Sequence, residues 1–269
     1  MKKLSLIVVL LCTIAISSSA QDSTLSSQDQ KYQRKEARRQ KINNLIRQSE
    51  EGILVFRKQS IFGIQGRSNG YGFFYELGKY KTTRKTNIYR IDFTESKNSK
   101  EEKMQNPSSF FGNPLIYGKI NYFYPITLGF GQQYILGQKG NKNGVAVSIV
   151  YNGGLALGLL RPYYVDVRDQ TLQIDRTIKY SQEDSALFLN GPYYGSGGFG
   201  KGWNEIKIKP GGFVKAAMRF DYGRFNEVVS ALEIGLSFEA YAEDIEIMFG
   251  HKKSTFLQGY VAFLFGRRK

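Results

Sequence analysis

The sequence predicts an all-β protein, a closed antiparallel transmembrane β-barrel of about ten strands, with eight or twelve strands as alternatives. Between Gly211 and Tyr241 apolar residues alternate with charged or small ones, and this period of two is that of a β-strand. Because the ionised residues share one face, that face cannot line an oily core. Only a closed barrel can turn the apolar face toward lipid and the charged face toward a lumen.

Composition supports the same fold class. The 269 residues include 18 Tyr, 19 Phe and 29 Gly but only 6 Pro, which suits strands with aromatic girdles. The net charge of +15 indicates anionic partners, and outside the cytoplasm these are lipid headgroups, lipopolysaccharide or an acidic periplasmic protein, not nucleic acid. The one cysteine, Cys12, lies in a segment predicted to be removed, so neither a disulfide nor thiol chemistry is expected.

The N-terminal part is predicted to be a signal and a leader. Residues 1–20 combine two lysines, an apolar run too short to span a bilayer and a small-residue cleavage site, which is typical of a secretory signal peptide. Residues 21–51 form a polar leader in which Lys31–Gln48 is expected to be a short basic helix carrying Arg38 and Arg39. The helix is either solvated or docks on a partner or a membrane surface.

Residues 52–269 are expected to form one barrel domain. The ten predicted strands are Ile53–Arg67, Tyr71–Lys81, Asn87–Glu95, Leu115–Tyr124, Ile126–Leu136, Gly144–Tyr151, Leu155–Arg168, Gly212–Tyr222, Val228–Ala242 and Thr255–Phe265. Turns are expected at Tyr124-Pro125 and Asn152–Gly154 on the periplasmic side, and Gly137–Asn143 is expected outside. Longer outer connections are Ser96–Pro114, Asp169–Gly211 and Glu243–Ser254. Short connections inside and mostly longer ones outside are typical of membrane barrels.

Alternation along the strands assigns a set of charged residues to the lumen. They are Arg57, Glu76, Arg90, Asp92, Lys119, Lys215, Arg219, Asp221, Glu233 and Glu239. Both signs are present, and a barrel of this width has little interior space. We therefore favour a plug of ion pairs over a narrow solute or ion path.

Candidate chemistry at the outer rim is sparse. The only histidine, His251, lies near Asp244, and the pair is a weak candidate for acid–base catalysis. One histidine and no mature cysteine predict no metal site, and no motif predicts a cofactor. Aromatic residues in the longest outer loop are expected to fold back over the lumen mouth, with stacking on a sugar as the alternative. These residues are Tyr193, Tyr194, Phe199 and Trp203.

The opposite, periplasmic rim is predicted to be strongly basic. The contributing side chains, together with Arg38 and Arg39 of the leader, are Lys81, Arg84, Lys85, Arg267 and Arg268. They are expected to contact lipid headgroups or an acidic periplasmic partner.

Residues 52–269 resemble the small bacterial outer-membrane β-barrel proteins. The resemblance is carried by the signal peptide, the alternating strands, the Gly/Tyr/Phe richness and the last strand, Phe256–Phe265, although Gly266–Lys269 follow where such proteins often end on an aromatic residue. It implies a non-enzymatic barrel in a Gram-negative outer membrane, with a structural, adhesion or assembly role. A barrel protease or lipid hydrolase and a soluble secreted ligand-binding barrel remain alternatives. The strand count also resembles the omptin proteases, but no catalytic residue of theirs has a counterpart here.

Overall fold

A computed structural model describes residues 31–40, 43, 57–104, 114–140, 143–169, 174–223 and 227–269. The chain divides into two compact units, Met1–Gln48 and Ser49–Lys269. In the first unit residues 31–40 are helical, within the segment expected to be a basic helix, while the signal peptide lies outside the described residues. Among the described residues no helix is both long and apolar enough to cross a membrane.

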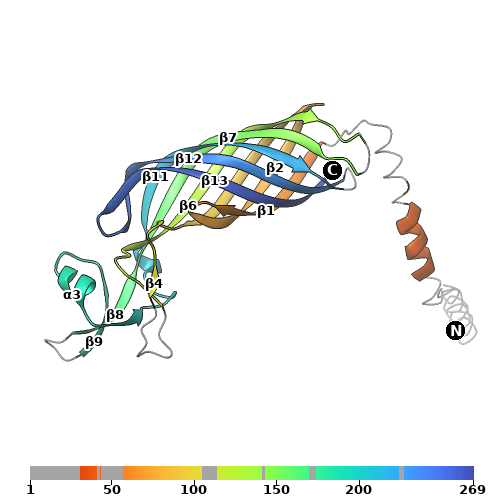
Figure 1. The fold of residues 1–269 in the computed structure, drawn as a ribbon. Coiled ribbons are helices and arrows are strands. Elements are labelled where there is room, and N and C mark those ends of the chain that lie inside the picture. Colours follow the sequence, from red (N-terminus) through yellow and green to blue (C-terminus); the bar gives the residue numbers. More distant parts are fainter. Residues whose placement is uncertain are drawn as a thin grey trace, which may run out of the picture. The chain divides into compact units, whose positions relative to one another are not determined.

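The second unit is built on a closed antiparallel barrel of eight strands (Figure 1). Around the barrel their order is β1-β13-β12-β11-β7-β6-β3-β2, and β1 closes the ring by pairing with both β13 and β2. The strands are β1 (Lys58–Arg67), β2 (Gly70–Thr82), β3 (Lys85–Ser96), β6 (Asn121–Gly137), β7 (Ala146–Pro162), β11 (Lys207–Asp221), β12 (Val228–Met248) and β13 (His251–Arg268). The predicted fold class is confirmed, with eight strands instead of about ten.

Two of the predicted turns are wrong, and their loss accounts for the lower strand count. Pro125 pairs with Gly158 inside β6, and its carbonyl oxygen accepts a hydrogen bond from the Thr94 hydroxyl at 3.1 Å. Asn152 is a buried lumen residue in the middle of β7. Gly154 is needed for close approach, because a Cβ there would lie 2.1 Å from the carbonyl oxygen of Leu128. Pro125 and Asn152–Gly154 therefore lie within continuous strands and contact neighbouring strands, and neither forms a turn.

The connections alternate between two ends of the barrel. At the terminal end, where β1 begins and β13 stops, the described connecting residues are 83–84, 138–140, 143–145, 222–223 and 227. At the opposite end, which we call the loop end, the described connecting residues are 68–69, 97–104, 114–120, 163–169, 174–206 and 249–250. The segment Gly137–Asn143, predicted on the outer side, therefore belongs to the terminal end. The predicted outer connection Glu243–Ser254 is wrong, because these residues belong to β12 and β13 except for a two-residue turn at 249–250. The expected alternation holds only in that the two longest connections lie at the loop end.

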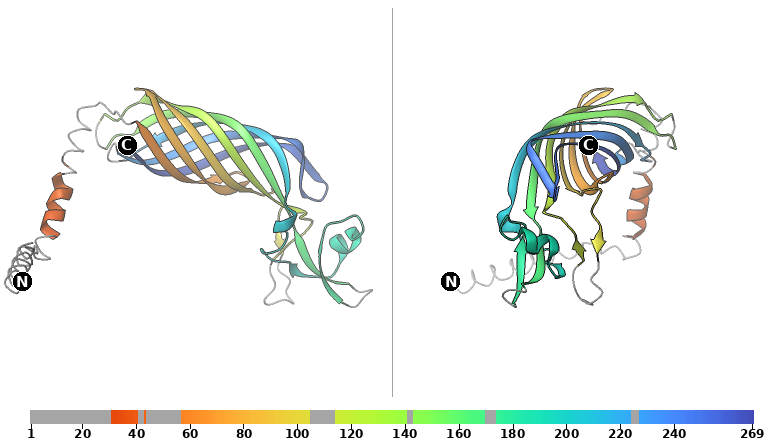
Figure 2. Two further views of the ribbon diagram at one scale, coloured as in Figure 1. Left: turned by 180° about the vertical axis from the view of Figure 1, so that it is seen from behind. Right: turned by 60° about the vertical axis from the view of Figure 1, so that its left-hand side comes forward.

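The long connections at the loop end fold into a separate structure, which we call the cap (residues 97–104, 114–120, 163–169 and 174–206; Figures 1 and 2). One sheet of the cap has the order β10-β8-β9, and β4 pairs with β5. The elements are β4 (Lys103–Met104), β5 (Leu115–Ile116), β8 (Tyr164–Asp169), β9 (Ile174–Lys179), α3 (Ser185–Asn190), β10 (Tyr193–Ser196) and η1 (Trp203–Glu205). The sequence predicted only loops for most of this region.

The cap has an apolar core of its own. Its buried residues are Leu115, Ile116, Tyr163, Val165, Val167, Ile178 and Phe188. Burial raises the pKa of the Tyr163 phenol to about 12, and this hydroxyl accepts a hydrogen bond from the Ile116 backbone N–H at 3.0 Å. This contact ties the two long connections together, so the cap is a packed unit and not a set of free loops.

The outer face of the barrel is apolar all the way round. Exposed residues include Phe62, Ile64, Phe73, Leu77, Leu128, Phe130, Leu155, Val214, Met218, Ile234, Leu236, Phe238, Leu257, Val261 and Phe263. Such a continuous band does not suit water but matches the lipid face of a transmembrane barrel. The architecture is that of the small bacterial outer-membrane β-barrels, the class that the sequence resembles.

Candidate functional site

The barrel lumen holds a balanced set of eight ionised side chains. Four are cationic, Arg67, Arg90, Lys215 and Arg219, and four are anionic, Glu76, Asp92, Glu233 and Glu239. Each of these side chains is at most 2 % exposed. Because the charges cancel and each has a partner, the usual cost of burying single charges is largely offset.

Glu233 lies at the centre of the network. Its carboxylate accepts hydrogen bonds from Arg90 at 2.7 Å, from Arg219 Nε at 2.8 Å and from the Tyr260 hydroxyl at 2.9 Å. Arg219 also makes a two-pronged contact with Glu76, at 2.8 and 2.6 Å. Bidentate pairs of this kind are among the strongest side-chain hydrogen bonds.

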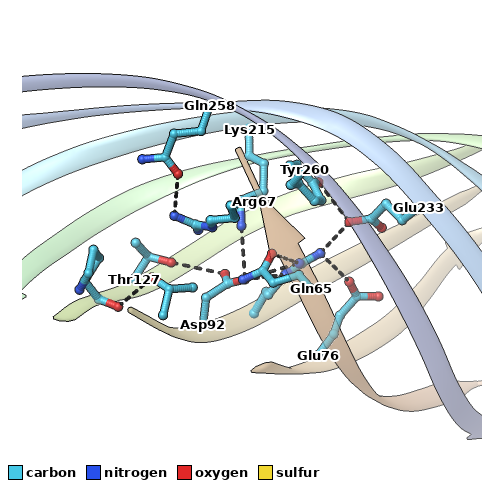
Figure 3. A network of polar contacts seen from close by, with 12 residues as sticks. Gln65, Arg67, Glu76, Asp92, Thr127, Lys215, Glu233, Gln258 and Tyr260 are labelled. Atoms are coloured by element: carbon cyan, nitrogen blue, oxygen red, sulfur yellow. Dashed lines mark hydrogen bonds and ion pairs between the residues drawn. The ribbon is translucent and has the colours of Figure 1, made fainter. Parts of the chain in front are cut away.

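Two further groups continue the network toward the loop end (Figure 3). The Asp92 carboxylate accepts hydrogen bonds from Lys215 at 3.0 Å, from Gln65 at 3.0 Å and from Thr127 at 3.1 Å. Arg67 donates from one terminal nitrogen to Glu239 at 2.6 Å and to Gln258 at 2.8 Å. Every barrel strand contributes to this polar interior, since Ser148 of β7 joins through Gln133 of β6.

The lumen is closed by side chains on the side of the network that faces the loop end. A buried apolar cluster there is built around Phe123, Phe213 and Tyr241, with Phe256 packed against it. The Phe123 ring centroid lies 5.4 Å from those of Tyr241 and Phe256. Together with the cross-linked charges, this cluster occupies the interior that a solute path would need.

The structure brings most of the predicted lumen residues together, but not all. Glu76, Arg90, Asp92, Lys215, Arg219, Glu233 and Glu239 lie in the network. Asp221 is buried but lies at the terminal end, bound to Lys139 at 3.2 Å and Arg268 at 2.5 Å. Lys119 precedes β6 and binds Glu101 of the cap at 2.8 Å, where burial lowers its pKa. The Arg57 assignment is wrong, because this residue precedes β1 and is exposed.

Arg67 is the ionised residue of the network that sequence reasoning missed. It stands at the very end of β1, beside the predicted hairpin, where a charged residue is ordinarily solvent-exposed. Arg67 lies two residues after Gln65, so alternation along β1 places both side chains on the same, inward face. This spacing was the one sequence feature that could have predicted its burial. Partners 172 and 191 residues away, on β12 and β13, decide its burial, and no local pattern contains them.

The predicted basic rim is only partly available for contact. Lys81, Arg84, Lys85 and Arg267 are exposed at the terminal end. Arg268 is half-buried and its guanidinium binds Asp221, so its assignment to headgroup or partner contact is wrong. Arg38 and Arg39 are exposed on the helix of the first unit.

The predicted acid–base pair is not joined. The Nδ1 atom of His251 lies 3.1 Å from the Gly250 carbonyl oxygen, and Asp244 is an exposed residue of β12. Within the described part of the chain no hydrogen bond links the two. Among the same residues no group of three or more His, Cys, Asp and Glu side chains is arranged to hold a metal ion.

A buried arginine fixes the cap to the barrel rim. Arg161, at the end of β7, is fully buried, and its guanidinium carbon lies 4.2, 4.7 and 4.6 Å from the ring centroids of Tyr122, Phe199 and Trp203. It donates to the Phe199 carbonyl oxygen at 2.7 Å, and so does the Trp203 indole N–H at 2.8 Å. Phe199 and Trp203 therefore fold back onto the barrel rim and Arg161, and not over the lumen mouth as expected. The lumen is filled by side chains of the barrel strands themselves.

Arg161→Met should loosen this attachment, because methionine keeps the length but loses the hydrogen bond and the contacts with three rings. Trp203 is the only tryptophan of the chain. We expect its fluorescence to shift to longer wavelength and trypsin to cleave faster at Lys201. Arg176→Met is the control, since Arg176 forms a partly exposed cap ion pair with Asp169. Identical spectra for Arg161→Met and the unsubstituted chain would contradict this role.

Comparisons with known proteins are sparse. No protein-family model matches the sequence, and no curated protein matches it. Among solved structures, Ail, the attachment invasion locus protein of Yersinia pestis, crystallised with the heparin analogue sucrose octasulfate, is 10 % identical with a TM-score of 0.37 over 80 % of this chain and 100 % of its own. Neisserial surface protein A has the same identity and TM-score over 79 % and 96 %.

Proposed function

We propose that this chain is a Gram-negative outer-membrane protein that binds partners through its cap, an adhesion-type role, and performs neither transport nor catalysis. A cleaved signal peptide exports it, and the cap faces outward. The observation that carries the proposal is the folded cap itself: a barrel with only a structural role has no need of a separate sheet and core beyond the membrane band.

The filled lumen supports this proposal against a channel. A solute would have to displace ion pairs that cross-link the strands, and breaking one buried pair costs about 3–5 kcal/mol. The separated His251 and Asp244 give no support to an enzyme. The apolar outer band is unfavourable for a soluble ligand-binding barrel.

The exposed basic residues at the terminal end are assigned a second, supporting role. Lys81, Arg84, Lys85 and Arg267 would face phosphate headgroups of the inner leaflet or an acidic periplasmic protein. Each such contact with an anionic surface contributes about 1 kcal/mol. This rim would anchor the barrel, while recognition takes place at the other end.

The proposal is tested by removing most of the cap. Residues 164–205 are replaced by a short Gly-Ser turn that joins β7 to β11, and the variant is displayed on cells of a Gram-negative host strain. We expect the barrel to keep its resistance to unfolding in detergent while adhesion to mucin-coated, collagen-coated and bare surfaces falls at least tenfold. The control is His251→Ser at the tip between β12 and β13, where the ring lies against the Gly250 carbonyl oxygen of the same tip.

Two results would overturn the assignment. Undiminished adhesion of the capless barrel would remove the cap from binding. Stable conductance steps of the purified full chain in planar bilayers would show that solutes pass the lumen.

A further inference from the structure

The cap and the barrel rim line a cavity of about 510 Å³ that is open to solvent on one side, a volume within the range of small-molecule sites. Three separate parts of the chain line it: the ends of β2 and β3, the connection that holds β4 and β5, and the residues that follow β10. The lining includes Tyr71, Glu95, Lys97, Asn98, Lys103 and Phe199. A cavity assembled from three distant segments depends on the cap being folded.

The polar groups of this cavity are of mixed sign. Glu95 and Glu101 supply carboxylates, while Lys97, Lys103 and Lys119 supply ammonium groups. Glu101 is neutralised by Lys119 at 2.8 Å, and Lys97 lies 4.0 Å from Glu95. With hydrogen-bond acceptors and donors interleaved, the site suits a ligand whose groups both donate and accept. Three lysines against two glutamates leave a net charge of +1, which is small for binding a polyanion.

Phe199 provides an apolar platform in the cavity wall. It is 71 % exposed, yet it is held rigidly. Its carbonyl oxygen accepts hydrogen bonds from Arg161 and Trp203, and its ring contacts the Arg161 guanidinium at 4.7 Å and the Trp203 ring at 5.3 Å. Because the ring is already held in place, little conformational entropy is lost when a flat apolar surface binds to it.

We propose that this cavity binds a short, neutral or weakly charged oligosaccharide, with one sugar face stacked on Phe199 and hydroxyl groups hydrogen-bonded to Glu95, Lys97 and Asn98. Polyhydroxylated rings combine an apolar face with hydroxyl groups that both donate and accept. The inference rests on the proposed binding role of the cap. The same chemistry is present in the core sugars of lipopolysaccharide and in glycans of another cell, so the test includes both sources.

The experiment measures binding of oligosaccharides to the full chain in lipid nanodiscs, by calorimetry and by the fluorescence of Trp203. The probes are lipid-free, dephosphorylated core oligosaccharide, the neutral glycan lacto-N-neotetraose and a sulfated oligosaccharide. We expect one of the first two to bind with little dependence on salt. Phe199→Ala should weaken this binding about tenfold, as expected for loss of an aromatic contact. Ile174→Ala, which changes an exposed apolar residue of the cap outside the cavity lining, should bind normally.

Preference for core oligosaccharide would identify the same membrane as the source, and preference for lacto-N-neotetraose another cell. Absence of binding by both, equal binding by Phe199→Ala, or salt-sensitive binding of the sulfated probe alone would overturn the site. Adhesion of cells displaying Phe199→Ala separates this result from the proposed function. If the cavity fails the binding test while these cells still adhere and capless cells do not, the cap binds through another surface.

Discussion

Glu233→Gln is expected to destabilise the barrel by about 3–5 kcal/mol, because it removes the charge shared by two buried guanidinium groups. Arg90 and Arg219 both donate to this carboxylate, and neither reaches water. Glutamine preserves the shape and one acceptor oxygen, so the loss reports charge and not packing. Urea unfolding in lipid vesicles, followed by the mobility shift of the folded barrel on gels, measures it.

The matched control is Glu243→Gln on the same strand. The Glu243 side chain is 62 % exposed and pairs with Lys209, so its loss is expected to cost no more than about 1 kcal/mol. A similar small cost for Glu233→Gln would mean that water fills the lumen, and the argument against a solute path would then fail.

Ile234→Arg is expected to cost about 2–4 kcal/mol, since it places a charge in the lipid face near the middle of the membrane band. Ile234 follows Glu233 directly but points the other way, and it is 48 % exposed on the outer surface. It pairs with Met218 of β11 and Val261 of β13, whose side chains are also exposed on the outer surface. The same unfolding assay in vesicles measures the effect.

Position within the band provides the control for this substitution. Ile208→Arg makes the same chemical change at the loop-end start of β11, where arginine reaches the headgroup region and the expected cost is about 0–1 kcal/mol. Equal effects at both positions would contradict the placement of the membrane along the strands. If removing the charge of Glu233 and adding a charge at Ile234 both destabilise the barrel, Glu233 faces the lumen and Ile234 faces lipid.

Strand periodicity was sufficient to predict the fold class and the facing of most charged residues. Apolar and charged residues alternate around Arg219 and Glu233, and this pattern can be read from a short segment. The folded barrel keeps it because each strand must present one face to lipid. Strand ends were less predictable. Pro125 and Gly154 read as turn residues from sequence, yet Pro125 pairs with Gly158 inside β6, and Gly154 lies inside β7, where the Leu128 carbonyl oxygen leaves no room for a Cβ.

The sequence alone thus determined that this chain closes into a barrel with an apolar exterior and a charged interior, because a period of two in polarity is a local property. Only the tertiary structure decided that four cations and four anions neutralise one another, and that the connections at the loop end fold into a cap pinned by Arg161. Those features join residues far apart in the chain. Strand register and barrel closure decide which side chains meet across the lumen, and no short segment of the sequence specifies either of them.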